Sequence, residues 1–202
     1  SLFIKRDDLI DTEISGNKWR KLKYNIALCE SKMKEGILTF GGAFSNHLVA
    51  TAAACKNANL KSIGVVRGEE LTAESNSTLK RCAELGMELV FISREEYAMR
   101  NDKAYHETVG VDYPSMQLVP EGGANYYGMV GCQEILSEID VEFDHVFLAQ
   151  GTSTTSCGIV FGSNEHQQIH VVPALKGFDS LSEMNSLFLK TGIDKETIGD
   201  LM

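Results

Sequence analysis

The chain of 202 residues carries 28 acidic and 19 basic residues, a formal net charge of −9. Such a surface repels phosphate backbones and anionic lipids, so we expect neither a nucleic-acid nor a membrane partner. A hydrophobic content of 43% is ordinary for a globular protein, and no apolar run approaches the ~20 residues that span a bilayer. The first residues lack the layout of a signal peptide, so we expect a cytoplasmic protein.

Strand-like and helix-like hydrophobic patterns alternate along the chain. After a strand-like start at residues 2–5, apolar residues recur every three or four positions from Trp19 to Met33, which predicts an amphipathic helix that ends before Gly36. Short strands and intervening helices should follow: strands at 37–40, 63–66, 89–92 and 116–119, and helices through 48–55, 79–86 and about 94–107.

The same alternation continues to about residue 177. A Gly-rich turn at 121–123 precedes a helix predicted from about Tyr126 to Ile139, a strand at 146–149, a second Gly/Thr-rich turn from Gly151, a short helix and a strand at 169–175. Strands that alternate with helices indicate βαβ units, an α/β fold and a mostly parallel sheet. In such folds ligands bind in the turns at the carboxyl ends of the strands.

The first notable turn contains Lys18. Gly16 and Asn17 suit a tight turn and a helix N-cap, which places Lys18 in the first helical turn. The helix dipole disfavours a cation there, yet the same effect lowers the pKa of an amine that must be neutral to attack a carbonyl group. The alternative is an exposed lysine at the start of a basic helix, which continues with Arg20, Lys21 and Lys23.

The second turn reads Gly41-Gly42-Ala43-Phe44-Ser45-Asn46-His47. Its glycines let the backbone approach a ligand, and Ser45 and Asn46 offer side-chain donors beside the free N–H groups of a helix start. This combination predicts a site for a carboxylate or another anion. A Gly-rich turn with a serine N-cap explains the same residues without a ligand.

The third turn runs from Gly151 to Gly158 and is rich in hydroxyl side chains. Small hydroxyl residues at a helix start can hold a phosphate through backbone N–H and hydroxyl donors. The segment is neither a Walker A loop nor a GxGxxG fingerprint. A polar turn with a threonine N-cap remains the alternative, but three such turns in one βα chain predict a ligand site.

The cysteines and the remaining histidines predict no metal site. Five dispersed cysteines without a CxxC pair are typical of reduced thiols that pack in a core. We expect the histidines outside the second turn to be structural or exposed, since none shows ligand spacing: His106, His145, His166 and His170.

Five segments resemble, in order and spacing, those of the 1-aminocyclopropane-1-carboxylate deaminase/D-cysteine desulfhydrase family. SGNKWRKL resembles the family's GNKxRKL, and GGAFSNH is similar to GGxxSNH/Q. PEGGANYYGMVGC looks like PxGGSxxxGxxGY/F, FDHVFLAQGTSTTSCGI resembles a strand with its phosphate loop, and VVPALKG matches the strand that follows. The resemblance extends to about Gly177.

By this resemblance the cofactor is pyridoxal 5′-phosphate (PLP), and Lys18 is the lysine that bonds covalently to it. Asn46 would hydrogen-bond its 3′-hydroxyl group, while Ser45, Asn46 and His47 would bind the substrate carboxylate, with Ser45 assisting proton movement. The phosphate would be held by the third turn, foremost by Thr152 and Thr155: Gly151, Thr152, Ser153, Thr154 and Thr155. The family's loop usually has glycines near 153 and 154, so these two side chains either narrow the phosphate pocket or add donors to it.

The implied fold is the tryptophan-synthase-β-like one (PLP fold type II), with two parallel-sheet βαβ domains and the site in the cleft between them. Residues 1–34 and 115–202 would form the larger, PLP-binding domain and 35–114 the smaller one. Family members form dimers, so we expect a homodimer. They have about three hundred residues, so the chain appears incomplete at its C-terminus.

The implied activity is a PLP-dependent deaminase or lyase that acts on a small amino acid. A D-cysteine-like substrate would give pyruvate, ammonia and sulfide, whereas the cyclopropane amino acid would give 2-oxobutyrate and ammonia. Two alternatives belong to other classes. One is a non-catalytic relative that binds PLP or another ligand. The other is a nucleotide-binding βα domain, which needs a ribose-binding acid after the first Gly-rich turn; this sequence has none convincingly placed there.

Overall fold

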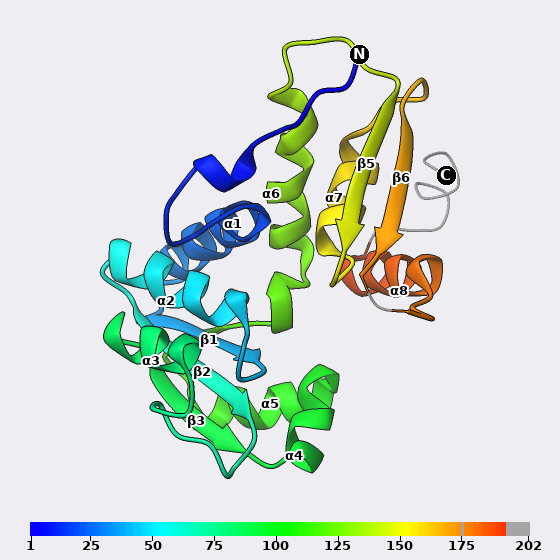
Figure 1. Ribbon diagram of the computed structural model, residues 1–202. Coiled ribbons are helices and arrows are strands. Elements are labelled where there is room, and N and C mark those ends of the chain that lie inside the picture. The colour runs from blue at the N-terminus through cyan, green and yellow to red at the C-terminus, as the bar shows by residue number, and fades with distance from the viewer. Residues whose placement is uncertain (175, 193–202) are drawn as a thin grey trace.

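The computed structural model describes residues 1–174 and 176–192, which form two parallel sheets packed against helices (Figure 1). The first sheet has four strands in the order β3-β2-β1-β4: β1 (Gly36–Gly41), β2 (Lys61–Arg67), β3 (Glu88–Ile92) and β4 (Met116–Val119). The second pairs β5 (His145–Gln150) with β6 (Gln168–Pro173). All strand pairs are parallel, as the alternating pattern predicts.

Helices cover both faces of the four-stranded sheet, which is why every residue of β1 is buried. On one face, α2 (Asn46–Asn57) and α3 (Ser77–Glu84) pack Leu48 and Leu79 against Val66. On the other face, α4 (Arg94–Ala98) and α5 (Lys103–Asp112) pack Tyr97 and Val109 against Phe40.

Helices α6 (Tyr126–Ser137), α7 (Thr154–Gly162) and α8 (Ser180–Thr191) pack beside the β5–β6 sheet (Figure 1). Glycines let α6 approach its neighbours closely: a Cβ atom at Gly131 would overlap the carbonyl oxygen of Arg20, and one at Gly158 would overlap that of Met129. Phe147 and Val172 on the strands stay 69% and 57% exposed.

Helix α1 (Asn17–Ser31) packs against α6 and α2 and so connects the two sheets. The Arg20 guanidinium is 1% exposed. It forms ion pairs with Glu138, beyond the end of α6, and with Asp7 in the short 3-10 helix η1 (Asp7–Leu9). Such a buried cation needs both partners, because an unpaired buried charge is strongly destabilising.

The predicted elements are present, with three differences. The polar helix expected at 94–107 is divided into α4, the 3-10 helix η2 (Met99–Asn101) and α5, because Asp102 adopts an extended conformation between them. The last strand ends at Pro173, and its predicted end at Leu175 lies outside the described residues. No strand is formed at residues 2–5.

All five cysteines are free and buried, as predicted. Within residues 1–174 and 176–192, no helix combines the length and the apolar character needed to cross a membrane.

Candidate active site

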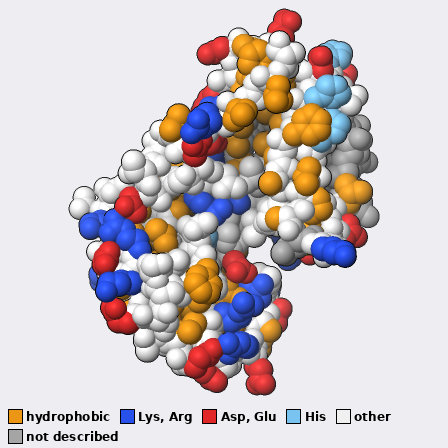
Figure 2. Space-filling model, viewed as in Figure 1, with side chains coloured by type: hydrophobic (Ala, Val, Ile, Leu, Met, Phe, Trp, Pro, Cys, Tyr) orange, Lys and Arg blue, Asp and Glu red, His pale blue; other side chains and the backbone are white. Residues whose placement is uncertain are grey.

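Residues from all three notable turns line one cavity of about 270 Å³. Lys18 comes from the first turn, and Gly151, Thr152 and Thr155 come from the third; the second contributes Ser45, Asn46 and His47. Figure 2 shows basic side chains in a hollow between the upper and lower parts of the visible face. The predicted site residues are thus largely brought together, although 133 positions separate Lys18 from Gly151 along the chain (151 − 18).

Lys18 lies in the first turn of α1, as predicted, and its ammonium group donates to Asn17 Oδ1 at 2.8 Å. Gly16, the N-cap residue directly before α1, has φ +63°, a conformation that favours glycine. The Lys18 side chain is partly buried, and this burial lowers its pKa. A lowered pKa increases the fraction of neutral, nucleophilic amine.

The turn and N-cap predicted at Gly16 and Asn17 are present, with Gly16 rather than Asn17 in the N-cap position. Gly16 is the N-cap, and no side chain caps the helix there. Asn17 is the first helical residue, and its amide nitrogen donates to Thr155 Oγ1 at 2.8 Å instead. The amide therefore joins the start of α1 to the third turn.

The second turn contains a serine N-cap and also lines the cavity. Ser45 is the N-cap of α2 and accepts a hydrogen bond from the Leu48 N–H at 3.3 Å, while it also lines the cavity. Asn46 is exposed at the first position of α2. A Cβ atom at Gly41 would lie 2.6 Å from Leu48 Cγ, so only glycine allows this close turn.

His47 is 3% exposed, and its Nε2 lies 3.0 Å from the Thr39 hydroxyl. Burial, followed by the charges of Lys21 and Lys18, lowers the pKa of His47 to about 3. The ring is therefore neutral at physiological pH.

In the third turn, the side chains at 153 and 154 do not narrow the cavity. Ser153 Oγ accepts from the Gln150 side-chain amide at 2.7 Å, and neither Ser153 nor Thr154 lines the cavity. Within the described ranges, the buried hydroxyl of Thr154 has no hydrogen-bond partner. The Thr155 hydroxyl lines the cavity and accepts from Asn17.

Lys21 is a second amine in the cavity and was not predicted as a site residue. It is 1% exposed and donates to Thr152 Oγ1 at 3.2 Å. Burial and the charge of Lys18 lower the pKa of Lys21 to about 7. Its position three residues after Lys18, on the same helix face, is the signal that could have identified it.

The turn at 121–123 closes one side of the cavity. Gly122 and Gly123 have φ +68° and +70°, and a Cβ atom at Gly122 would lie 2.7 Å from Thr152 Cγ2. Glu121 lines the cavity and accepts from Tyr97 Oη at 2.8 Å and from Arg100 Nε at 2.5 Å. The Gly-rich turn was predicted from the sequence, but none of its residues was predicted to belong to the site.

These groups suit a ligand that carries both a phosphate and a carbonyl group. The Lys21 amine, the Thr152 hydroxyl and the free N–H groups at the start of α7 are phosphate donors of the kind found at helix N-termini. Lys18 supplies an amine of lowered pKa for the carbonyl group. The Thr154 hydroxyl is buried at the same helix start and does not line the cavity.

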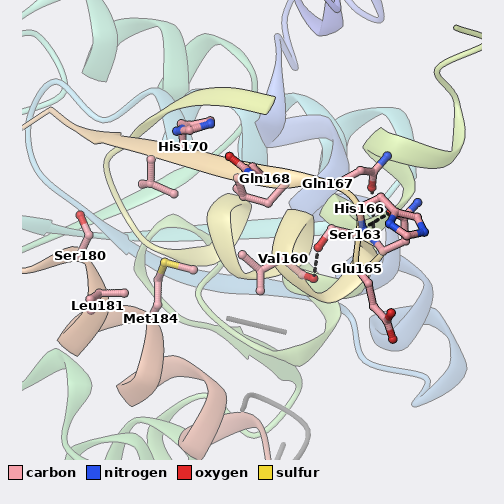
Figure 3. A pocket seen from close by; sticks show the side chains of 13 residues that line it. Val160, Ser163, Glu165, His166, Gln167, Gln168, His170, Ser180, Leu181 and Met184 are labelled. Atoms are coloured by element: carbon pink, nitrogen blue, oxygen red, sulfur yellow. Dashed lines mark hydrogen bonds between the residues drawn. The ribbon is translucent and has the colours of Figure 1, made fainter. Parts of the chain in front are cut away.

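A larger groove of about 1060 Å³ lies between the end of α7, β6 and α8 (Figure 3). Val160, Ile169 and Met184 contribute its apolar lining. None of the predicted site residues borders it, so we assign the site to the smaller cavity.

Two of the histidines expected to be structural or exposed are neighbours. His145 Nδ1 lies 3.1 Å from His170 Nε2 across β5 and β6, and Phe147 stacks on His170. Among the residues that the structure describes, no group of three or more side chains is arranged to hold a metal ion.

Comparison with known sequences supports the resemblance. A family model described as "Pyridoxal-phosphate dependent enzyme" matches residues 1–185. The bifunctional D-cysteine desulfhydrase/1-aminocyclopropane-1-carboxylate deaminase, mitochondrial, of Arabidopsis thaliana is 33% identical over 181 residues, covering 80% of this chain and 45% of the relative. A putative 1-aminocyclopropane-1-carboxylate deaminase of Pyrococcus horikoshii is 32% identical, covering 80% and 50%. The chain thus spans about half the length of the curated relatives it matches.

Solved structures give the same result for the fold. A structure described as an ACC deaminase homologue superposes with a TM-score of 0.77 at 26% identity, covering 96% of this chain and 61% of that one. Serine racemase from Dictyostelium discoideum superposes with a TM-score of 0.65 at 16% identity, covering 84% and 53%, a likeness of fold alone.

Proposed function

The chain belongs to the pyridoxal-phosphate-dependent enzyme family, and on that premise we propose that it is the PLP-binding part of a deaminase or lyase that acts on a small amino acid. The predictions of family, of a type II α/β fold and of PLP as the cofactor are confirmed by the sequence and structure matches. The activity and the site residues remain our proposals.

One observation carries the proposal: two amines of lowered pKa, Lys18 and Lys21, line the same cavity as the start of α7. We assign Lys18 to the covalent attachment of PLP. The phosphate would be held by Lys21, Thr152, the N–H groups at the start of α7 and, as predicted, Thr155. We retain Gly151 as the close-approach position, since no atom lies within 4 Å of a Cβ atom placed there.

The Ser45–His47 turn lines the same cavity as these groups. We assign Asn46 to the 3′-hydroxyl of PLP, and Ser45 and His47 to the substrate carboxylate. This arrangement would place the substrate between the start of α2 and Lys18. An anion there is favoured by the N-terminal end of the α2 dipole and by the two lysines.

Bound PLP supplies an electron sink for the charge that develops at the substrate α-carbon. The chain itself must move protons and hold the substrate. We assign the Lys18 amine to accept the proton from the substrate α-carbon, since burial lowers its pKa and so increases the fraction of neutral amine. We assign Ser45 to assist this transfer, and the neutral His47 ring would contribute a hydrogen bond rather than a charge.

The substrate class is a small amino acid with a bond that breaks after loss of the α-proton or by ring opening. D-cysteine and 1-aminocyclopropane-1-carboxylate both fit this description, and the names of the relatives include both activities. We propose no choice between them. We also propose a homodimer and a cytoplasmic location. We keep the proposed division into two domains with its first boundary at 34/35, but β4 (Met116–Val119) pairs with β1, so we move the second boundary from 114/115 to a position after residue 119.

The test uses the full-length gene product. We expect the wild type to show a visible absorbance band when PLP is bound, and Lys18→Ala to lose it. Lys32→Ala, at an exposed position on the same chain, is the matched control and should keep the band. A wild type that stays colourless after addition of PLP would contradict the proposal.

A second measurement separates an enzyme from a non-catalytic relative. Release of a 2-oxo acid from D-cysteine or the cyclopropane amino acid supports turnover. A PLP band without any 2-oxo acid would instead support the binding-only alternative.

A further inference from the structure

Gln150 places a polar side chain in a buried position at the end of β5, where it is 1% exposed. Its Nε2 donates to Ser153 Oγ at 2.7 Å, whereas its Oε1 has no hydrogen-bond partner in the described part of the chain. Burying an amide group that is half satisfied is unfavourable, and an apolar side chain would fill the same space at lower cost. The contact with Ser153 therefore needs an explanation beyond packing.

Ser153 occupies the N-cap position of α7, yet its side chain makes no cap hydrogen bond. A serine at this position normally accepts from the N–H group two or three residues later. In five other helices the N-cap side chain accepts from the N–H group three positions later, and in α2 and α4 that side chain is a serine: α2, α3, α4, α6 and α8. The Ser153 hydroxyl is thus chemically able to cap α7, but it contacts Gln150 instead.

The absence of this cap leaves the first turn of α7 with free donors. The first backbone hydrogen bond of the helix runs from the Cys157 N–H to the Ser153 carbonyl oxygen at 2.9 Å. Three earlier N–H groups have no partner among the residues that the structure describes: those of Thr154, Thr155 and Ser156. Free N–H groups and the positive end of the helix dipole together attract an anion.

A buried amine beside the same helix start indicates an anionic ligand independently. Thr152, which directly precedes Ser153, accepts from Lys21 Nζ at 3.2 Å, and Lys21 is 1% exposed. An ammonium group that is buried against a neutral hydroxyl is stabilised when an anion binds next to it. Any side chain that capped α7 would take one N–H group away from that anion.

We propose that Gln150 is a positioning residue: it holds the Ser153 hydroxyl away from the start of α7, so that the N–H groups there stay available to the cofactor phosphate. Neither Gln150 nor Ser153 lines the cavity, so both act through the backbone of the helix start. The identity of the anion as the phosphate of PLP rests on the proposed function. The uncapped helix does not, because it follows from contacts within this chain.

The test titrates the cofactor-free, full-length protein with two aldehydes, PLP and pyridoxal, which lacks the phosphate. Gln150→Leu removes the amide that holds Ser153, and the double variant Gln150→Leu/Ser153→Ala also removes the hydroxyl that could then cap α7. Gln117→Leu is the matched control, because the Gln117 amide is on β4 and donates to the Leu118 carbonyl oxygen at 3.0 Å. The absorbance band of the bound aldehyde gives each Kd.

We expect the Kd of PLP to rise about fivefold in Gln150→Leu, the change that corresponds to one typical N-cap hydrogen bond competing with the phosphate. The Kd of pyridoxal should stay within about twofold, since it has no phosphate to lose this contact. The double variant should return the Kd of PLP to within about twofold of the wild type, and Gln117→Leu should not change it beyond that range. A defect in packing alone would not be rescued by removing the Ser153 hydroxyl.

Three results would overturn the proposal: an unchanged Kd of PLP in Gln150→Leu, an equal loss for pyridoxal, or a loss that persists in the double variant. If Gln150→Leu does not fold, Ser153→Ala in the wild-type background decides. Its Kd for PLP should be unchanged, because the hydroxyl is already held away from the helix start; tighter binding would show that Ser153 caps α7, and weaker binding that it contacts the phosphate. A wild type that shows no band with either aldehyde would count against the proposed function instead.

Discussion

The side chain of Asn17 joins Lys18 to Thr155: its Oδ1 accepts from Lys18 Nζ at 2.8 Å, and its Nδ2 donates to Thr155 Oγ1 at 2.8 Å. Lys18 and Thr155 therefore share one amide, although the amide and Thr155 are 138 positions apart. The uncharged Asn17 side chain thus contacts both the amine assigned to the cofactor carbonyl group and the turn assigned to the phosphate.

Replacing this amide by a carboxylate should change the charge without changing the shape. In Asn17→Asp, a negative charge next to Lys18 stabilises the ammonium form and raises its pKa. The pH at which half of the protein shows the PLP absorbance band should rise by about one unit. A pH titration of that band, with Asn17→Ala as the uncharged control, measures the effect, and an unmoved midpoint in Asn17→Asp would refute it.

Lys21→Met should stabilise the cofactor-free protein while it weakens PLP binding. Below pH 7 the wild type buries a charged amine, so the methionine variant should be more stable by about 1–3 kcal/mol. Between about 7 and the ordinary value of 10.5, the unfolded wild type binds more protons than the folded one, so wild-type stability rises with pH. The stability difference should therefore shrink over that interval.

Urea unfolding at several pH values measures this difference, and titration with PLP should show at least a tenfold loss of affinity, the effect of one charged hydrogen bond. Lys32→Met, at an exposed lysine, is the control and should change neither quantity appreciably. If Lys21→Met were less stable than the wild type at pH 6, burial of the charged Lys21 amine would not be destabilising, and the prediction would be wrong.

Gly122→Ala should destabilise the protein by about 1–3 kcal/mol. The new methyl group would adopt a strained φ of +68° and would lie 2.7 Å from Thr152 Cγ2. Gly110→Ala is the contrasting control, because Gly110 is in α5 with open space around it, and alanine there should stabilise the helix by about 0.5–1 kcal/mol. We expect the thermal unfolding midpoint to fall in Gly122→Ala and to rise in Gly110→Ala. Equal shifts of the two midpoints would contradict this prediction.

The order of strands and helices could be predicted because hydrophobic period and glycine position are local signals. The same signals located the three turns, since each combines a strand end, small residues and polar side chains. The division of the predicted 94–107 helix at Asp102 could not be predicted, because it depends on how Tyr97 and Val109 pack on Phe40.

The contacts inside the site depend on neighbours that are distant in sequence. Asn17 suits a helix cap by its local sequence, whereas its hydrogen bond to Thr155 depends on a residue 138 positions away. Lys21 looked like part of a basic surface, yet it is 1% exposed and meets Thr152, 131 positions away. Thr39 gave no signal, because a threonine in a strand is ordinary until a buried imidazole lies next to it.

The buried cysteines have a practical consequence. Burial raises the pKa of all five thiols, to about 12 for Cys55 and Cys157 and about 11 for Cys82. An alkylating reagent needs an accessible thiolate, so the native protein should be almost inert to it. Labelling of a cysteine would therefore report local unfolding around it. Cys55 and Cys82 report on α2 and α3, which cover the four-stranded sheet, and Cys132 and Cys157 report on α6 and α7. The order in which these peptides gain mass would show which part of the chain unfolds first.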